Sequence, residues 1–328
     1  MMDKRKLFCG FTAVCMSALL LLCGCAPKKE LADPYRIPDG GLVQFVSTGE
    51  NLFPEGFASD LCVPLSDGDL SVENVNAEAF GLFDVHDAEV LSQHNLYERV
   101  YPASTTKILT CLIALERGDP EMVVTVPSES DIQVAGSSMA DLKPGDQLKL
   151  KDLLRGLMVP SGNDAAVAIA HCIGGDTESF SRLMNARAKE LGAVHSHFVN
   201  PHGLPDADHY TTVYDMYLIF QEALKNPQFM EIAGTKEYSC KVTNPKDAVP
   251  EREITWTSSN GFYTGKFDFT EGMEILCGKT GHTNAAGFCL VLGEKDRDGH
   301  RYISIIMKSA EYENLYRSMR NLAGKAFD

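Results

Sequence analysis

Ser104 and Lys107 are the two residues whose types and spacing first suggest chemistry. They lie three positions apart, and an apolar stretch follows Lys107. At the start of a helix this spacing puts both side chains on one face. A serine hydroxyl needs a base to become a nucleophile, and a lysine can be that base when burial or nearby positive charge lowers its pKa. The backbone N–H groups of the helix start could stabilise an oxyanion.

By itself the Ser-x-x-Lys pattern is weak evidence. A chain of this length should contain on the order of one such pattern by chance. The alternative is an ordinary helix with a serine cap and a surface lysine.

Two further patterns could complete a site. Ser161-Gly162-Asn163 lies between two predicted helices, and Lys279-Thr280-Gly281 ends an apolar segment. The first could equally be a turn with a helix cap. In the second, Lys279 could hold a carboxylate or tune Lys107, and Thr280 could donate a hydrogen bond to a substrate. Gly281 would let a ligand backbone approach closely.

A cluster of histidines invites a metal site or a Ser-His-Asp triad. The cluster comprises His195, His197, His202 and His209. The chain has neither an HExxH motif nor a Gly-x-Ser-x-Gly elbow around Ser104. We therefore predict a loop of solvated histidines.

The elements that must position these residues follow from hydrophobic periodicity. Strands are predicted at 79–85, 89–93, 274–279, 287–293 and 301–308. Helices are predicted at 104–117, 150–157, 164–173, 176–191, 214–225 and 311–326, with short β pieces within 120–150. This order predicts an α+β fold whose antiparallel sheet of about five strands is built from both ends of the chain. Helices would cover the faces of the sheet, and an all-helical subdomain would be inserted within about 104–270.

The three motifs occur in the order found in β-lactamases and penicillin-binding proteins. With their flanking residues they resemble the serine D-Ala-D-Ala carboxypeptidases, which are the low-molecular-weight penicillin-binding proteins of the peptidase S11 family. The resemblance covers about residues 77–310 and is carried by segments 102–107, 157–166, 198–204, 210–212 and 279–283. It implies a β-lactamase/transpeptidase-like fold.

The resemblance also implies a role for each motif residue. Ser104 would be the nucleophile and Lys107 its proton acceptor. Ser161 and Asn163 would relay protons and hold the substrate amide.

The third motif would bind the substrate. Lys279 and Thr280 would hold the terminal carboxylate beside Gly281, and the backbone N–H groups of Ser104 and His282 would form the oxyanion hole. The implied partner is a peptidoglycan stem peptide ending in D-Ala-D-Ala, and β-lactams would acylate Ser104 as substrate mimics. The resemblance implies no metal and no organic cofactor.

Two alternatives remain open, and one departure from the family pattern is present. The chain could be a β-lactamase, although we find no convincing Glu-x-x-x-Asn pattern between Asn163 and Lys279, or a non-catalytic sensor of β-lactams or muropeptides. Some relatives place a carboxylate-binding arginine after the last strand, where this chain has Lys308-Ser309-Ala310-Glu311.

The N-terminus resembles a bacterial lipoprotein signal. Basic residues at 4–6 precede an apolar run at 7–22, and Cys25 follows Gly24. We expect a signal peptide at 1–24, lipid on Cys25 that anchors the protein to the membrane, a tether at 25–75 and a peptidase domain at 76–328. An uncleaved anchor and an ordinary secretory signal are the alternatives, and each places the domain outside the cytoplasm.

Composition narrows the remaining classes. The formal net charge of -15 and the lack of a basic stripe argue against nucleic-acid binding. Beyond the signal and Cys25, six cysteines without a CxxC pair argue against a zinc site and leave disulfides or free thiols open. They are Cys62, Cys111, Cys172, Cys240, Cys277 and Cys289.

Overall fold

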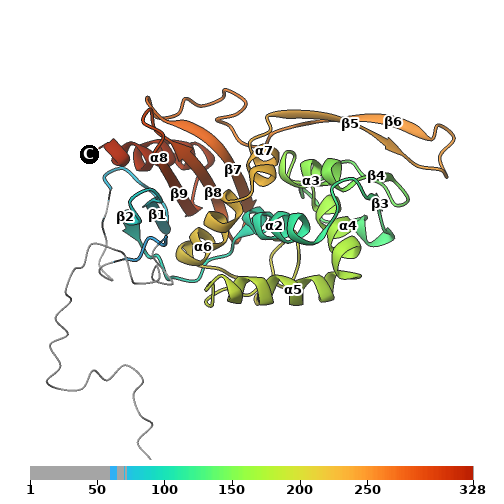
Figure 1. The fold of residues 1–328 in the computed structure, drawn as a ribbon, viewed down its shortest axis with the longest axis horizontal. Coiled ribbons are helices and arrows are strands. Elements are labelled where there is room, and N and C mark those ends of the chain that lie inside the picture. The colour runs from blue at the N-terminus through green and yellow to red at the C-terminus, as the bar shows by residue number, and fades with distance from the viewer. Residues whose placement is uncertain (1–59, 65–69, 71, 328) are drawn as a thin grey trace, which may run out of the picture. The chain divides into compact units, whose positions relative to one another are not determined.

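The computed structural model describes residues 60–64, 70 and 72–327 (Figure 1). The predicted signal peptide at 1–24, Cys25 and most of the tether at 25–75 lie outside the described residues. In the part of the chain that is described, no helix combines the length and apolar character needed to span a bilayer.

Five strands of the described chain form one antiparallel sheet, in the order β2-β1-β9-β8-β7. Its strands are β1 (Ala79–Asp84), β2 (Glu89–His94), β7 (Glu274–Thr283), β8 (Gly287–Lys295) and β9 (Arg301–Ser309). Leu82 of β1 pairs with Ser304 of β9, so the two ends of the domain meet in the middle of the sheet. The predicted five-stranded sheet is confirmed.

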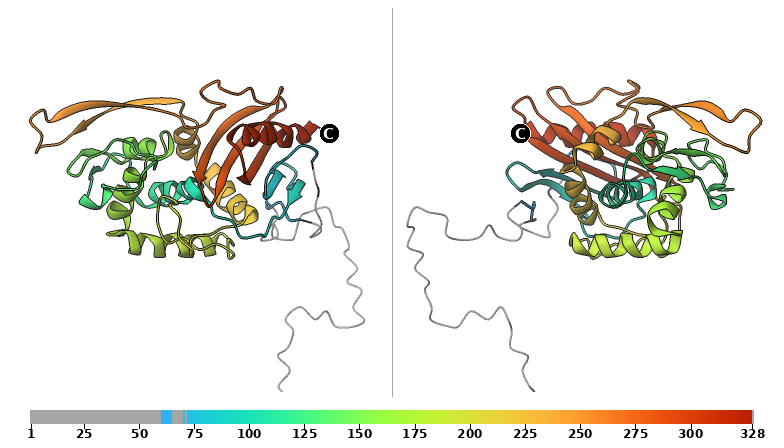
Figure 2. Two further views of the ribbon diagram at one scale, coloured as in Figure 1. Left: turned by 180° about the vertical axis from the view of Figure 1, so that it is seen from behind. Right: turned by 45° about the vertical axis from the view of Figure 1, so that its right-hand side comes forward.

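Helices cover both faces of this sheet because its strands are apolar on both sides (Figure 2). Leu290 and Leu292 of β8 pack against α8 (Tyr312–Gly324). Val291 points the opposite way, into the core shared with α6 (Val213–Leu224).

The helices between the two halves of the sheet form the second layer of the fold. They are α2 (Lys107–Arg117), α3 (Leu150–Met158), α4 (Asn163–Gly174), α5 (Thr177–Glu190) and α7 (Pro227–Ala233). α2 is buried on most of its surface, from Lys107 to Ala114, and α3 to α7 surround it (Figure 1). A central buried helix explains the unbroken apolar run after Lys107.

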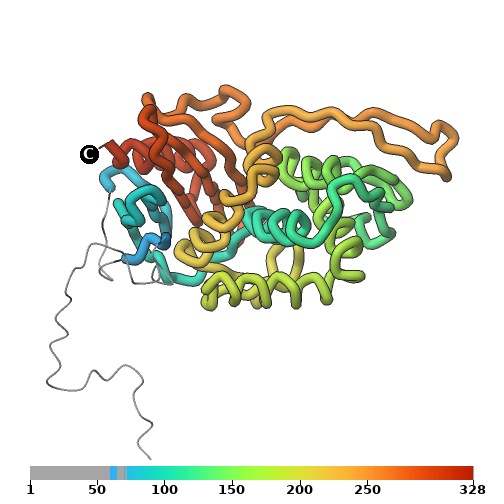
Figure 3. Tube along the Cα trace, viewed as in Figure 1, coloured from blue at the N-terminus to red at the C-terminus, as the bar shows by residue number. Residues whose placement is uncertain are grey.

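The inserted region is not all-helical as predicted. Its strands β3 (Val123–Thr125), β4 (Gln147–Lys149), β5 (Glu237–Thr243) and β6 (Glu251–Thr257) form a four-stranded antiparallel sheet in the described chain. The β5–β6 hairpin extends beside α3 and β4 as a long arm (Figure 3). The short β pieces predicted within 120–150 are confirmed as β3 and β4. Exposed polar residues alternate along β6, so apolar content gave little signal for the β5–β6 hairpin.

Candidate active site

Ser104 lies on a tight turn at the entrance to the central helix. The predicted helix at 104–117 begins as a 3-10 turn, η1 (Ala103–Thr106), and α2 starts at Lys107. Ala103 adopts the left-handed conformation, with φ 48°. Gly203 (φ 88°) packs against this turn so closely that a Cβ there would lie 1.8 Å from the Ala103 carbonyl oxygen. The loop that carries Gly203 thus braces the turn that presents Ser104.

Lys107 is completely buried beside Ser104, with a relative exposure of 0%. Its Nζ lies 2.8 Å from Ser104 Oγ, 2.7 Å from Asn163 Oδ1 and 2.9 Å from the His202 carbonyl oxygen. Burial, followed by the positive charge of Lys279, holds the pKa of Lys107 well below its usual value. A neutral amine at hydrogen-bond distance from a hydroxyl can take its proton.

Lys279 forms a second buried amine–hydroxyl pair. Its Nζ donates to Ser161 Oγ at 2.9 Å and to the Thr280 carbonyl oxygen at 2.9 Å. Burial lowers the pKa of Lys279 to about 7. Ser161 adopts a left-handed conformation (φ 66°), which directs its buried side chain toward this amine.

β7 lies directly against the Ser104 turn. A Cβ at Gly281 would lie 3.0 Å from the Ser104 backbone nitrogen and 3.1 Å from the Pro102 carbonyl oxygen. A side chain at this position would make the strand or the Ser104 turn give way by a few tenths of an ångström. Glycine is therefore favoured here by close approach rather than by an unusual φ.

The motif residues meet at one pocket. Ser104, Ser161, Thr280, Gly281 and His282 line it, while Lys107, Asn163 and Lys279 lie buried beside the hydroxyls of Ser104 and Ser161. The eight predicted site residues in the described chain are thus brought together. Cys25, the predicted lipidation site, lies outside the described residues.

Several residues that line the pocket carried no recognisable sequence signal. Ser259 follows β6, and its Oγ lies 2.6 Å from Thr280 Oγ1. The others come from three separate segments and are Gly136, Ser138, Phe288, Cys289, Tyr312, Leu315 and Tyr316. A lone serine or an aromatic residue resembles any other in a single sequence, and only the fold places these side chains at the pocket.

The prediction of solvated histidines is wrong for His209, while His202 is half-buried. His209 is buried; its Nδ1 accepts from the Val199 N–H at 3.1 Å, and its Nε2 lies 2.8 Å from Thr106 Oγ1. Burial lowers the pKa of His209 to about 4 and that of His202 to about 3, so both are neutral at pH 7. Their loop packs against the Ser104 turn, which buries the His209 ring and covers much of the His202 ring.

The comparison with known families decides the classification. The family model for D-alanyl-D-alanine carboxypeptidase, peptidase S11, matches residues 68–311. The chain belongs to this family.

Several carboxypeptidases of this family match most of this chain in sequence. D-alanyl-D-alanine carboxypeptidase DacF of Bacillus subtilis is 34% identical over 234 residues, which cover 70% of this chain and 57% of the relative. D-alanyl-D-alanine carboxypeptidase DacC of Escherichia coli is 32% identical over 265 residues, covering 77% and 60%. The chain therefore spans less than two thirds of the length of these relatives.

Solved structures agree with this family fold. A Streptomyces DD-transpeptidase superposes with a TM-score of 0.71 at 26% identity, covering 79% of this chain and 99% of that one. The D-alanyl-D-alanine carboxypeptidase of Mycobacterium tuberculosis gives 0.68 at 27% identity, covering 80% and 94%.

The stretch that lacks the family's arginine does not direct a cation toward Ser104. Lys308 is the first residue of this stretch, and it forms an ion pair with Glu78 instead. Tyr312 follows a few residues later and lines the pocket with its ring. Phe288 stacks on His282 with ring centroids 4.1 Å apart, which extends the same aromatic wall.

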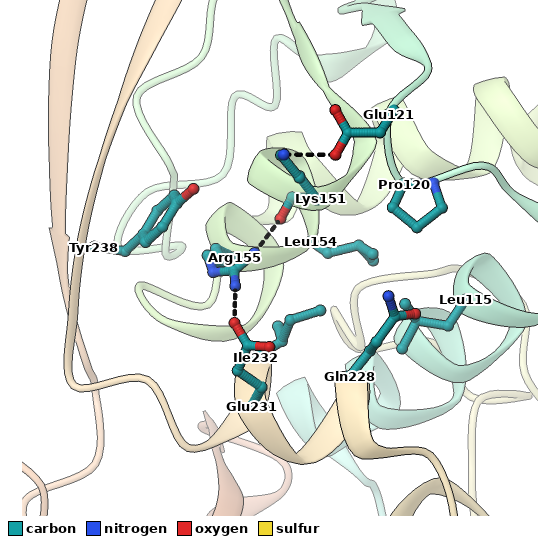
Figure 4. A pocket seen from close by; sticks show the side chains of 10 residues that line it. All are labelled: Leu115, Pro120, Glu121, Lys151, Leu154, Arg155, Gln228, Glu231, Ile232 and Tyr238. Atoms are coloured by element: carbon teal, nitrogen blue, oxygen red, sulfur yellow. Dashed lines mark hydrogen bonds and ion pairs between the residues drawn. The ribbon is translucent and has the colours of Figure 1, made fainter.

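A second pocket lies between α3, α7 and β5 (Figure 4). Its charged groups pair with one another: Lys151 with Glu121, and Arg155 with Glu231. The Arg155 guanidinium also lies over the Tyr238 ring, 4.6 Å from its centroid. None of the motif residues lines this pocket, and its charges are already neutralised.

The described residues form neither a metal-binding cluster nor a disulfide. Among the described residues, no group of three or more His, Cys, Asp or Glu side chains could hold a metal ion. The six cysteines left open by the sequence are free thiols in the structure. Burial raises the pKa of Cys289, which lines the active-site pocket, to about 12, so this thiol is protonated and a poor nucleophile.

Proposed function

We propose that this chain is a serine D-Ala-D-Ala carboxypeptidase that trims peptidoglycan stem pentapeptides through an acyl-enzyme on Ser104. The observation that carries the proposal is the buried Lys107 amine, 2.8 Å from Ser104 Oγ. Family membership and the names of the relatives support the same activity.

Acylation would begin with proton transfer from Ser104 to Lys107. Ser104 Oγ then attacks the carbonyl carbon of the penultimate D-alanine. The resulting oxyanion lies between the backbone N–H groups of Ser104 and His282. Collapse of this intermediate breaks the peptide bond, and Lys107 returns its proton through Ser161 to the departing nitrogen, which leaves Lys107 neutral again. Lys279 holds the Ser161 hydroxyl in this position.

Deacylation would reuse the same base. A water molecule attacks the ester carbon and gives its proton to Lys107, and Ser104 Oγ leaves with a proton. Asn163 holds the Lys107 amine on one side and can contact the substrate amide on the other. The ester on Ser104 is thus formed and then hydrolysed, and the products are free D-alanine and a shortened peptide.

The terminal carboxylate of the substrate would bind at the Lys279 side of the pocket. Thr280 and Ser259 supply hydroxyls there, and Lys279 supplies positive charge. The substrate backbone can approach β7 closely because Gly281 has no side chain. β-Lactams carry a carboxylate beside a reactive amide and would acylate Ser104 in the same position.

The extracytoplasmic location is proposed from the N-terminal sequence. A lipoprotein signal at 1–24 and lipid on Cys25 would tether the peptidase domain (76–328) to the outer face of the membrane, near its substrate. Mass spectrometry of the protein from a bacterial membrane fraction tests this. A diacylglyceryl mass on Cys25 is expected, and an unmodified N-terminus would refute the anchor.

The activity is tested by incubating the purified domain with muropeptides and measuring their masses. Loss of one alanine from pentapeptides is expected from the wild type and is expected to be absent in Ser104→Ala. Rapid multiple turnover of penicillin would indicate a β-lactamase instead. Stable penicillin labelling without release of D-alanine would indicate a sensor.

A further inference from the structure

Asp164 is a buried acid that the proposed reaction does not use. It follows the Ser-Gly-Asn motif in the first turn of α4 and has a relative exposure of 0%. Its Oδ1 accepts from the Ala140 N–H at 2.8 Å, and its Oδ2 accepts from the Leu142 N–H at 3.0 Å. A buried carboxylate is stable only when such donors replace its water.

These bonds hold the loop that forms one wall of the active-site pocket. Gly136 and Ser138 from this loop line the pocket together with Ser104. Between the two N–H groups bound by the carboxylate, Asp141 adopts the left-handed conformation, with φ 57°. A loop in this conformation needs outside contacts to keep it.

Two neighbours fix the same loop from other sides. The Asn163 N–H donates to the Ser138 carbonyl oxygen at 2.9 Å. Trp256 of β6 donates from Nε1 to the Ala140 carbonyl oxygen at 2.9 Å. Asp164 therefore holds the loop as a hydrogen-bond acceptor, and Trp256 holds the same loop as a hydrogen-bond donor.

The charge of Asp164 also acts on Lys107. The Lys107 amine donates to Asn163 Oδ1 at 2.7 Å, and Asp164 is the next residue along α4. Lys279 from β7 lowers the pKa of Lys107 and Asp164 raises it, while the half-buried His202 ring is neutral. Burial raises the pKa of Asp164 itself, and the backbone N–H groups of Ala140, Leu142 and Ala165 oppose that rise. In its ionised form Asp164 is thus a negative charge that opposes Lys279 at this amine.

We propose that Asp164 is a positioning residue whose one carboxylate both fixes the pocket loop at 136–142 and balances the charge around Lys107. The inference rests on the proposed peptidase function and adds a residue to its machinery. Asp164 need not touch the substrate: it acts through the backbone of Ala140 and Leu142 and through the field at Lys107.

The test is the pH profile of kcat/KM for D-alanine release by Asp164→Asn. The amide keeps the size of the side chain but loses the charge and one acceptor. We expect KM to rise about tenfold, since one hydrogen bond to a charged group is lost. The acidic limb should move to lower pH, because Lys107 loses a negative charge that raises its pKa.

Two matched variants separate the two effects. Trp256→Phe removes the other hydrogen bond that holds the loop and keeps the Asp164 charge. KM should therefore rise, while the acidic limb of the pH profile should not move. Asp164→Glu keeps the charge but changes the position of the carboxylate. KM should again rise, and the acidic limb should not move. An acidic limb of Asp164→Asn that coincides with that of the wild type would overturn the proposal.

The outcome remains decisive if a variant is unstable or the wild type is not a peptidase. If Asp164→Asn does not fold, amide hydrogen exchange of the wild type is measured. Exchange at Ala140 and Leu142 as fast as in exposed loops would refute the loop contact.

If the wild type releases no D-alanine, the proposed function fails. The acidic limb is then measured from the pH dependence of the rate at which penicillin acylates Ser104, which tests the role of Asp164 independently.

Discussion

Lys107 Nζ and Ser104 Oγ lie 2.8 Å apart, and the amine has no exposure to solvent. The pair combines a hydroxyl that faces the pocket with a base whose pKa burial keeps low. Proximity and a lowered pKa are the two conditions for general-base catalysis by a lysine.

Lys107→Met should therefore abolish acylation while leaving the fold intact. Methionine fills the same volume but cannot take a proton, and general-base catalysis contributes about 10²–10⁴-fold. The rate of labelling by fluorescent penicillin should fall by that factor. Lys246→Met, which changes an exposed lysine beyond β5, is the matched control and should label at the wild-type rate. Equal rates in both variants would exclude Lys107 as the base.

Binding of the substrate carboxylate should weaken as pH rises through the pKa of Lys279. Burial lowers that pKa to about 7, so the free enzyme loses this positive charge above neutral pH. KM for a peptide ending in D-Ala-D-Ala should rise severalfold between pH 6.5 and 8.5. A peptide whose terminal carboxylate is amidated provides the control, since its KM should show little change. Parallel profiles for the two peptides would contradict a carboxylate site at Lys279.

Gly203→Ala should damage the site through the backbone. A Cβ at this position would lie 1.8 Å from the Ala103 carbonyl oxygen, so the turn that holds Ser104 must move. Penicillin acylation should fall at least tenfold, because misplaced reacting groups lose much of their rate advantage. Gly175 has a similar φ of 86° with no atom within 4 Å of its would-be Cβ.

Gly175→Ala is therefore the control for Gly203→Ala. It should lower the free energy of unfolding by about 1–2 kcal/mol for the left-handed conformation alone and leave acylation unchanged. Urea unfolding and penicillin labelling of both variants measure the two effects. Similar labelling by Gly203→Ala and Gly175→Ala would show that the Gly203 contact does not position Ser104.

Glu294 should make the fold less stable as pH rises. Its Oε2 accepts from Ser304 Oγ at 3.1 Å, and its buried Oε1 has no partner among the described residues. Burial raises the pKa of Glu294 to about 8, from 4.5 in the unfolded chain. Between these values the folded protein keeps a proton that the unfolded chain has lost. The free energy of unfolding should therefore fall by ~1.4 kcal/mol per pH unit across this window.

Glu294→Gln removes this dependence, since glutamine does not ionise. Relative to the wild type, the variant should gain stability between pH 5 and pH 8, as measured by urea unfolding at both values. A constant difference between the two proteins at pH 5 and pH 8 would show that Glu294 ionises normally.

Much of the architecture follows from local patterns in the sequence. Apolar periodicity predicted the strands of the main sheet and the helices α3 to α6 and α8, because one buried face imposes a regular repeat on each element. The β5–β6 hairpin escaped prediction, since its strands are mostly exposed and polar. Apart from the short β pieces within 120–150, only the helices of the inserted region carry an apolar repeat. The sequence therefore predicted an all-helical subdomain there.

The sequence by itself determined which residues could do chemistry: Ser104 and Lys107 by their spacing, and the other two motifs by their order. Only the tertiary structure decided that they share a pocket, because contacts between segments 56 and 118 positions apart depend on packing rather than on local pattern. The same packing buries Lys107 and Lys279, makes His202 and His209 neutral, and brings the 136–142 loop onto Asp164. Burial is a property of the assembled fold, and the lowered pKa of the Lys107 base depends on it.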